Sequence, residues 1–393
     1  HLSLRRQRQM CIRDRSTTAT TAKKKPKSEP ATPKSKRKAG DPSASRIDLP
    51  GPDVHGLREL PKLQVDGYSL QLRDNEGFVG DQASQTAFRA LLERWRRKHR
   101  SDGTDPLGLR HSRDMSKKEL DRLLRGQKVS DAANVMHSAI GEFAQELAAV
   151  IQRFLRQPSW EKVERIVVGG GFPESEAGER AILEAGAILE EMGVHVQLGR
   201  LSHEVDDGGL IGWVHLTPPE MLKKHDAILA IDIGGTNVRC GIVKTRHRKA
   251  RDFSLAKVVR REKWRHADEK PSRTNFVEHV AGMLEDMVRY AERKKIRLAP
   301  FIGIACPGLI RKDGSIARGA QNLPGDWESE NFHLPSALWR RMPMIGSGPT
   351  LVLMHNDAVV QGLSELPFMR DVGHWAVLTI GTGLGNASFT NRK

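Results

Sequence analysis

The stretch AILAIDIGGTNVRCGIVKT (227–245) decides the fold. Its first part, 227–235, is an apolar run that ends in two adjacent glycines, which predicts a buried strand followed by a tight turn. The second part, 238–245, predicts an antiparallel partner strand. In such a turn successive backbone N–H groups can point at a phosphate, and Thr236 and Asn237 add side-chain donors. The alternative is an ordinary Asp-Gly-Gly hairpin turn that binds nothing.

Asp232 comes near the end of the first predicted strand, just before the glycine pair. A carboxylate at this place can hold a hydrated Mg²⁺ ion, which bridges and neutralises phosphate oxygens. Together with Gly234 and Gly235, this residue completes the first candidate phosphate site.

A second glycine-rich turn, TIGTGLG (379–385), also follows an apolar strand. Gly381 and Gly383 would let the backbone approach a phosphate closely, and Thr382 could add a hydroxyl contact. The segment is no P-loop, because GxxxxGK[ST] occurs nowhere in the chain. Its GxGxG spacing is also a poor dinucleotide fingerprint.

His355-Asn356-Asp357 lies between a predicted strand and a predicted helix. A carboxylate fixed there could accept a proton from an attacking hydroxyl, as phosphoryl transfer to an alcohol requires. The alternative for Asp357 is a helix N-cap, which is physically as good. His355 is expected to serve packing or hydrogen bonding.

A third glycine run, Gly169-Gly170-Gly171, follows the apolar segment RIVV. Its bare backbone could lie against an adenine or a ribose, or it could be a plain loop.

Strand and helix patterns alternate along the chain, which predicts an α/β body with a parallel component. The segment 73–81 is expected to be turn and loop. Helices are predicted at 84–99, 131–155, 176–193 and 274–295, and further strands at 63–72, 165–171, 194–199, 301–308, 351–357 and 375–385. Strands that end in glycine or polar turns place those turns at the carboxyl edge of a sheet, where α/β ligands bind.

The chain has 393 residues and a formal net charge of +16, which invites a nucleic-acid interpretation until the charge is located. The basic excess lies mostly in residues 1–48. We predict a disordered basic tail over 1–50, because this stretch has almost no large apolar residue to bury. Residues 1–15 resemble translated adapter sequence and are left out of the fold prediction.

The three cysteines, Cys11, Cys240 and Cys306, form no CxxC pair, so a reducing compartment and no zinc site are expected. No apolar run reaches the length of a membrane helix, and no signal peptide is visible. A cytoplasmic location is therefore expected.

Taken together, these motifs resemble the ROK (repressor, open reading frame, kinase) family of sugar kinases, some of which are glucokinases. The resemblance rests on several segments: 164–172, 206–216, 230–243, 301–316, 321–327, 355–365 and 378–386. It implies an actin-like fold of two RNase-H-like lobes that close over ATP, Mg²⁺ and a sugar. It implies Asp357 as the base, with Asn356 at the sugar, and with Pro307, Gly308 and Asn322 near the cleft.

The order of the motifs departs from the usual family arrangement, because RIVVGGG and GLIGW precede AIDIGGT. A circular permutation is the simplest account, since the termini of domains often lie close together. We then expect one lobe over 51–215 and another over 216–393, with 356–393 packing against 51–205.

The chain also lacks the zinc cluster and sugar-binding Glu and His that the family often carries, and Glu76 or Asp81 is a guess for their place. The expected partners are a small sugar and, by analogy, a second copy in a homodimer, with no specific nucleic acid and no membrane. A sugar-responsive regulator and a pseudokinase that binds without turnover stay open as alternatives. The regulator is disfavoured because residues 1–60 show no helix-turn-helix periodicity.

Overall fold

The computed structural model describes Arg46, Leu49 and residues 55–75, 77–100, 105–125 and 130–392. The described residues all belong to one unit, which spans Gly40–Lys393. The predicted tail over 1–50 and the candidate Glu76 therefore lie outside the described residues, except for Arg46 and Leu49. No helix in the described part of the chain is long and apolar enough to cross a membrane.

The first sheet is built from one continuous stretch of chain, in the order β15-β10-β7-β8-β9. Its central strand β7 pairs antiparallel with β8, which pairs antiparallel with β9, while β10 and then β15 join on the other side in parallel. The strands are β7 (Ala227–Ile233), β8 (Val238–Lys244), β9 (Lys257–Trp264), β10 (Leu298–Cys306) and β15 (Leu351–Asn356).

The second sheet has the order β1-β2-β17-β16-β5-β6 and combines both ends of the described chain. Its central strand β16 pairs antiparallel with β17, which pairs antiparallel with β2, while β5 and then β6 join in parallel. The strands are β1 (Glu59–Leu60), β2 (Leu63–Tyr68), β5 (Arg165–Gly169), β6 (Gln197–Arg200), β16 (His374–Ile380) and β17 (Leu384–Asn391).

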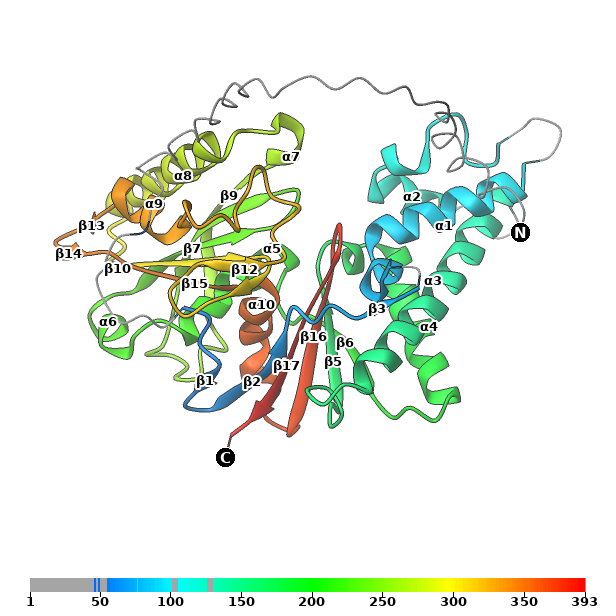
Figure 1. Cartoon of the computed structure of the whole chain (residues 1–393), viewed down its shortest axis with the longest axis horizontal. Helices are drawn as coiled ribbons and strands as arrows, with labels where there is room; N and C mark the ends of the chain where they lie inside the picture. Colours follow the sequence, from blue (N-terminus) through cyan, green and yellow to red (C-terminus); the bar gives the residue numbers. More distant parts are fainter. Residues whose placement is uncertain are drawn as a thin grey trace, which may run out of the picture. The chain divides into compact units, whose positions relative to one another are not determined.

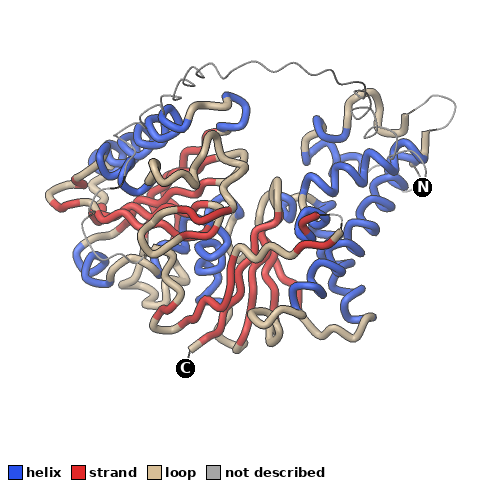
Figure 2. Tube along the Cα trace, viewed as in Figure 1, coloured by secondary structure: helices blue, strands red, loops and turns tan. Residues whose placement is uncertain are grey.

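Helices cover the sheets and bury their apolar faces (Figures 1 and 2). The helices α8 (Arg273–Arg293) and α9 (Leu334–Arg341) share a core with the first sheet, and α3 (Asp131–Leu155) and α4 (Glu176–Glu191) share one with the second. Serine N-caps begin several of them: the Ser130 side chain accepts from Ala133 N and the Ser175 side chain accepts from Gly178 N.

Helix α10 (Asp357–Glu365) packs against both sheets (Figure 1). Val360 joins the core cluster of Trp213 and Phe301, whereas Val359 joins that of Phe389 on β17. Such a position requires close approach, and Gly362 provides it: a Cβ there would lie 2.5 Å from the Phe389 ring. Because α10 begins directly after β15, its first residue is fixed where the two sheets meet.

The remaining helices are short connections or lie on the second sheet's side. They are η2 (Val79–Ala83), α1 (Gln85–Lys98), η3 (Ser112–Asp114), α2 (Lys117–Arg125), η4 (Phe172–Glu174), α5 (Val205–Ile211), η5 (Gly212–His215), α6 (Pro219–Lys224), α7 (His266–Glu269) and η6 (Leu366–Phe368). Three small antiparallel pairs complete the described fold: β3 (Arg73–Asp74) with β4 (Gly77–Phe78), β11 (Leu309–Ile310) with β12 (Ile316–Arg318), and β13 (Met344–Ile345) with β14 (Gly348–Pro349).

The predicted α/β class is confirmed, and the predicted helices and strands match within a few residues. Two predictions were wrong in detail. The strand predicted over 63–72 ends at Tyr68, because Ser69 takes a left-handed conformation with φ 50°. The loop predicted over 73–81 instead contains a short strand pair and the start of η2.

Candidate active site

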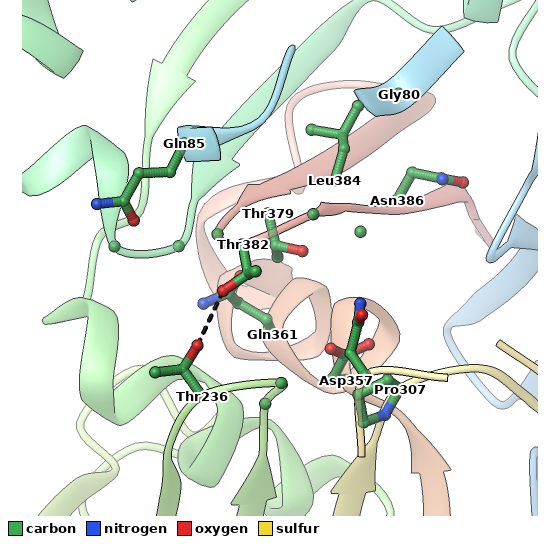
Figure 3. A pocket seen from close by; sticks show the side chains of 18 of the residues that line it. Gly80, Gln85, Thr236, Pro307, Asp357, Gln361, Thr379, Thr382, Leu384 and Asn386 are labelled. Carbon is green, nitrogen blue, oxygen red and sulfur yellow. Dashed lines mark hydrogen bonds between the residues drawn. The ribbon is translucent and has the colours of Figure 1, made fainter. Parts of the chain in front are cut away.

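One pocket of about 1080 Å³ gathers the turns that follow the strands of both sheets (Figure 3). These turns meet because each lies at the carboxyl end of its strand, the edge where α/β proteins bind ligands. The lining includes most of the predicted site residues: Asp232, Gly234, Gly235, Thr236, Asn237, Gly308, Asn322, Asn356, Asp357, Gly381, Thr382, Gly383, Gly170 and Gly171.

The first glycine loop is held from behind by α7. Gly234 N donates to Asn237 O at 2.9 Å, which closes the turn. The buried His266 ring approaches Gly234 O with its Nε2 at 2.8 Å, and Ala267 N donates to Thr236 O at 3.3 Å. These contacts occupy the outward carbonyls and fix the loop, which leaves the pocket side open to an anion.

The second glycine loop is held by the first turn of α1. Gln85 N donates to Gly381 O at 2.9 Å, and Thr86 Oγ1 donates to Thr382 O at 3.0 Å. The two loops also touch each other, because Thr236 Oγ1 and Thr382 Oγ1 are 2.9 Å apart (dashed line in Figure 3). A ligand that reaches both loops would therefore contact residues from both sheets.

The Asp232 carboxylate forms an ion pair with Arg239, a residue that was not predicted to belong to the site. Its Oδ2 lies 3.1 Å from Arg239 NH1, and Arg239 also pairs with Asp206, whose Oδ2 lies 3.0 Å from Lys263 Nζ. Burial raises the pKa of Asp232, and the Arg239 charge works against that rise. The pocket thus places two carboxylates and two cations beside the first glycine loop.

This donor set fits a hydrated Mg²⁺ ion better than a directly bound metal. A carboxylate has about four lone-pair positions, so Asp232 keeps capacity for a metal-bound water while it pairs with Arg239. Among the described residues, no group of three or more His, Cys, Asp or Glu side chains is arranged to hold a metal ion. The absence of a zinc site stays a prediction.

Asp357 is the first residue of α10, and the N-cap is its neighbour Asn356. The Asn356 side chain accepts from Ala358 N and Val359 N, the bonds that define the cap. The alternative interpretation of Asp357 as the N-cap is therefore wrong, although its Oδ1 also accepts from Ala358 N at 2.9 Å. With the cap supplied by Asn356, the Asp357 carboxylate is available to the pocket (Figure 3).

The Asp357 carboxyl group titrates near neutral pH. Burial, and then the negative charge of Asp232, raise its pKa from 3.8 to about 7. A carboxylate with a pKa near the working pH is well matched to taking a proton from an alcohol.

The residues next to Asp357 are tied into the backbone. Asn356 Nδ2 donates to Gly308 O at 2.9 Å, so this amide positions the Gly308 turn and keeps one N–H for a ligand. The buried His355 accepts from Asn356 N and lies 2.9 Å from Leu57 O, and burial lowers its pKa to about 4. It is therefore a neutral structural residue, as expected.

Gly308, Gln321 and Asn322, from the part of the chain that forms the first sheet and its helices, line the same pocket as Asp357. Ser69 and Gln71, from the part that forms the second sheet, line it close to Gly319: a Cβ there would lie 3.6 Å from Ser69 Oγ and 3.7 Å from Gln71 Nε2. Sequence reasoning missed these two residues, since neither belongs to a recognisable motif. Asp81 also lines the pocket, and Glu76 lies outside the described residues.

Of the three glycines at the end of β5, Gly169 to Gly171, only two line the pocket. Gly170, with φ 88°, and Gly171 are exposed to it, whereas Gly169 is buried beneath. A Cβ on Gly169 would lie 2.6 Å from the Leu201 side chain and 2.7 Å from Gln361 Oε1. Gly169 therefore makes room for neighbouring side chains and does not face a ligand in the pocket.

Comparisons with known proteins bear on the family of this chain. Residues 228–393 match the model of the ROK family, which confirms the resemblance noted in the sequence. A glucokinase of Thermotoga maritima is 29% identical over 171 residues, which are 42% of this chain and 44% of the glucokinase. The chain thus spans less than half the length of this curated relative.

Two solved structures are more distant. The Lmo2764 protein of Listeria monocytogenes, named as a candidate N-acetylmannosamine kinase, is 24% identical, with a TM-score of 0.31 over 42% of this chain and 47% of that chain. An exopolyphosphatase-like protein is 12% identical, with a TM-score of 0.27 over 65% of this chain and 89% of that chain. At these TM-scores neither adds to the assignment.

Proposed function

Since residues 228–393 belong to the ROK family, we propose that this chain transfers a phosphoryl group from ATP to a hydroxyl of a hexose or an N-acetylhexosamine. The family lies in the actin-like ATPase superfamily, and the kinase-named relative supports a sugar as the substrate. Because that relative is matched over less than half of its length, the specific sugar is left to experiment.

In the proposed reaction the Asp357 carboxylate takes the proton of the sugar hydroxyl. The oxygen then forms a bond to the γ-phosphorus while the bond from that phosphorus to the ADP oxygen breaks. The loops around Gly234–Thr236 and Gly381–Gly383 donate backbone hydrogen bonds to the phosphates. Asp232 would hold a Mg²⁺ ion through water, and the ion would neutralise phosphate charge.

The observation that carries this proposal is the state of Asp357. Its carboxyl group has a pKa raised to about 7 and shares one pocket with both glycine loops. A carboxyl group that served only to cap a helix would need neither the loops nor the pocket.

For the sugar side we propose Asn356, Gly308 and Asn322, with Glu76 as a further contact. The first three line the pocket, and their amide and carbonyl groups suit the hydroxyls of a sugar. Gly170 and Gly171 are proposed for the adenosine side.

We also propose that the chain is circularly permuted. The second sheet repeats the pairing pattern of the first sheet, although its central hairpin comes from the C-terminal end of the chain. Asn391 pairs with Leu63, and Arg392 N donates to Lys62 O at 3.0 Å, so these two strands could be joined by a tight turn. A rejoined chain, from Asp226 to Arg392, then Asn-Gly, then Leu63 to Leu216, should still bind ADP. Loss of that binding would contradict the proposal.

The proposed activity is tested by coupled ADP release with Mg-ATP and glucose, mannose, fructose, N-acetylglucosamine or N-acetylmannosamine. One sugar should raise ADP release, and Asp357→Asn should lower that turnover by about 10²- to 10⁴-fold. Asp371→Asn is the matched control, since Asp371 is an exposed carboxylate paired with Arg165. Binding of ATP or a sugar without turnover would favour the regulator or the pseudokinase instead.

A further inference from the structure

Helix α10 carries a second polar side chain that lines the pocket. Gln361 lies four residues after Asp357, so the two side chains share one face of the helix. All residues of α10 after Asp357 are buried, and Gln361 is only 7% exposed. Figure 3 shows the Gln361 side chain extending from α10 toward Thr382 of the second glycine loop.

The surrounding backbone makes room for this side chain. A Cβ on Gly169 would lie 2.7 Å from Gln361 Oε1, and a Cβ on Gly208 would lie 3.4 Å from Gln361 Cγ. Two elements, the end of β5 and α5, thus place a glycine against the Gln361 side chain. The glycines at these two places therefore leave the space that the Gln361 side chain occupies.

The amide is incompletely bonded. Within the described part of the chain, Gln361 Oε1 is buried and has no hydrogen-bond partner. Buried polar groups in proteins are nearly always satisfied, so an unsatisfied one points to a missing partner such as a ligand or water. The oxygen and nitrogen of an amide can also exchange places by a flip, so either end can meet that partner.

The pocket that Gln361 lines indicates the kind of partner that is missing. The same pocket is lined by the loop at Gly381–Gly383, by Gly170 and Gly171, and by the carboxylates Asp206 and Asp232. If the proposed function holds, this is where the phosphate chain of the nucleotide passes between the two halves. An uncharged amide that both donates and accepts suits a phosphate oxygen and the water bound beside it.

We propose that Gln361 is a nucleotide-contacting residue, whose amide nitrogen donates to a phosphate oxygen of the bound nucleotide while its oxygen accepts from an ordered water there. The role is separate from proton transfer by Asp357, one turn earlier on the same helix. It rests on the proposed function only in requiring that the pocket binds a nucleotide.

The test is calorimetric titration with Mg-ADP, without sugar, on the full chain and its variants. Gln361→Met keeps the shape and removes both polar groups, so the Kd for ADP should rise by about 10- to 100-fold, the effect of losing a hydrogen bond to a charged group. Gln361→Glu should bind more weakly still, because a carboxylate repels the phosphate. Gln152→Met on α3, outside the pocket lining, is the matched control and should bind as the wild type does.

Thermal melting separates the ligand role from a packing role. Because the Gln361 oxygen has no partner in the described residues, Gln361→Met should melt at or above the wild-type temperature. An unchanged Kd for ADP in Gln361→Met, or a weaker Kd that comes with a lower melting temperature, would overturn the proposal. A wild-type chain that binds no ADP would overturn it as well. A chain that binds ADP but phosphorylates no sugar refutes only the sugar kinase.

Discussion

The two sheets of this protein have the same pairing pattern but different routes through the sequence. The first takes all five of its strands in order from the continuous stretch 227–356, whereas the second combines strands from 59–68, 165–200 and 374–391. In each, a central strand pairs antiparallel with one neighbour, which pairs antiparallel with the next strand, while two parallel strands follow on the other side. The second sheet adds β1 at its edge. Pairing and burial of apolar faces, not the order of strands in the chain, therefore fix this arrangement.

At the site the two sheets share a similar backbone but differ in the charge of their side chains. Each central strand ends in a glycine loop, and the loops meet through Thr236 and Thr382. The strands differ one residue before their ends, where β7 has Asp232 and β16 has Thr379. Thr379 packs on bare backbone, since a Cβ on Gly385 would lie 2.2 Å from its Oγ1. The first sheet thus brings the carboxylates Asp232 and Asp357 to the pocket, whereas β16 of the second sheet has the uncharged Thr379 at the place that corresponds to Asp232.

If the second sheet, built from three separate stretches of chain, is as stable as the first, equivalent truncations in the two cores should lower the free energy of unfolding equally. Phe389 on β17 stacks on Trp375 with ring centroids 4.3 Å apart, and Phe301 on β10 packs against Trp213 at 6.0 Å, and both phenylalanines are fully buried. Phe389→Ala and Phe301→Ala should each lower the free energy of unfolding by about 3–5 kcal/mol. Urea denaturation followed by circular dichroism measures both.

A large inequality would break the comparison. If Phe389→Ala costs less than about 1 kcal/mol while Phe301→Ala shows the full loss, then the second sheet contributes little to cooperative folding. Leu183→Ala is a suitable control for both, because this side chain on α4 is 68% exposed and should cost little.

A smaller effect is expected where a glycine permits close packing in each half. A Cβ on Gly303 of β10 would lie 2.1 Å from the Trp213 ring, and one on Gly362 of α10 would lie 2.5 Å from the Phe389 ring. Gly303→Ala and Gly362→Ala should each lower the free energy of unfolding by about 1–3 kcal/mol through overpacking. Gly282→Ala on α8 meets open space and should be neutral or stabilising, which makes it the control. A neutral Gly362→Ala would show that α10 is not tightly packed on β17.

The sequence predicts the first half of this fold better than the second. The segment 227–245 shows its strand, turn and hairpin partner locally, and the structure agrees with it. Strand β9, KVVRREKW, was missed because charged residues alternate with few apolar ones at the edge of the sheet. Strand β17 was missed because its glycine-rich start hides the apolar residues after it, and its partner β2 is more than 300 residues away.

The residues of the site also differ in how well the sequence predicts them. Glycine loops and Asp357 are recognisable because each follows an apolar strand directly. Arg239, Gln361 and Ser69 could not be predicted as site residues, since only tertiary packing brings them to the pocket. The N-cap at Asn356 could have been weighed, because Asn and Asp are almost equally good caps and stand side by side.

The smallest expected effect on the free energy of unfolding comes from the ionisation of Asp357, which lies where the two sheets meet. Its pKa is about 7 in the folded protein and about 4 in the unfolded chain, so between these pH values the folded state binds more protons. The free energy of unfolding therefore falls as the pH rises from 4 to 7, and Asp357→Asn removes this loss. The variant should be more stable than the wild type at pH 8, by roughly 1–2 kcal/mol after solvent screening, and closer to it at pH 5.

Urea titrations of both proteins at pH 5 and pH 8 measure this difference. Asp371→Asn should behave in the opposite sense, because Arg165 holds the pKa of Asp371 below its usual range, so its contribution is present at neutral pH and lost on acidification. A difference between Asp357→Asn and the wild type that is the same at both pH values would mean that Asp357 has an ordinary pKa in the free protein. Burial and the nearby charge of Asp232 would then not raise the pKa of Asp357 in the free protein. That pKa could rise only when the substrates displace water from the pocket.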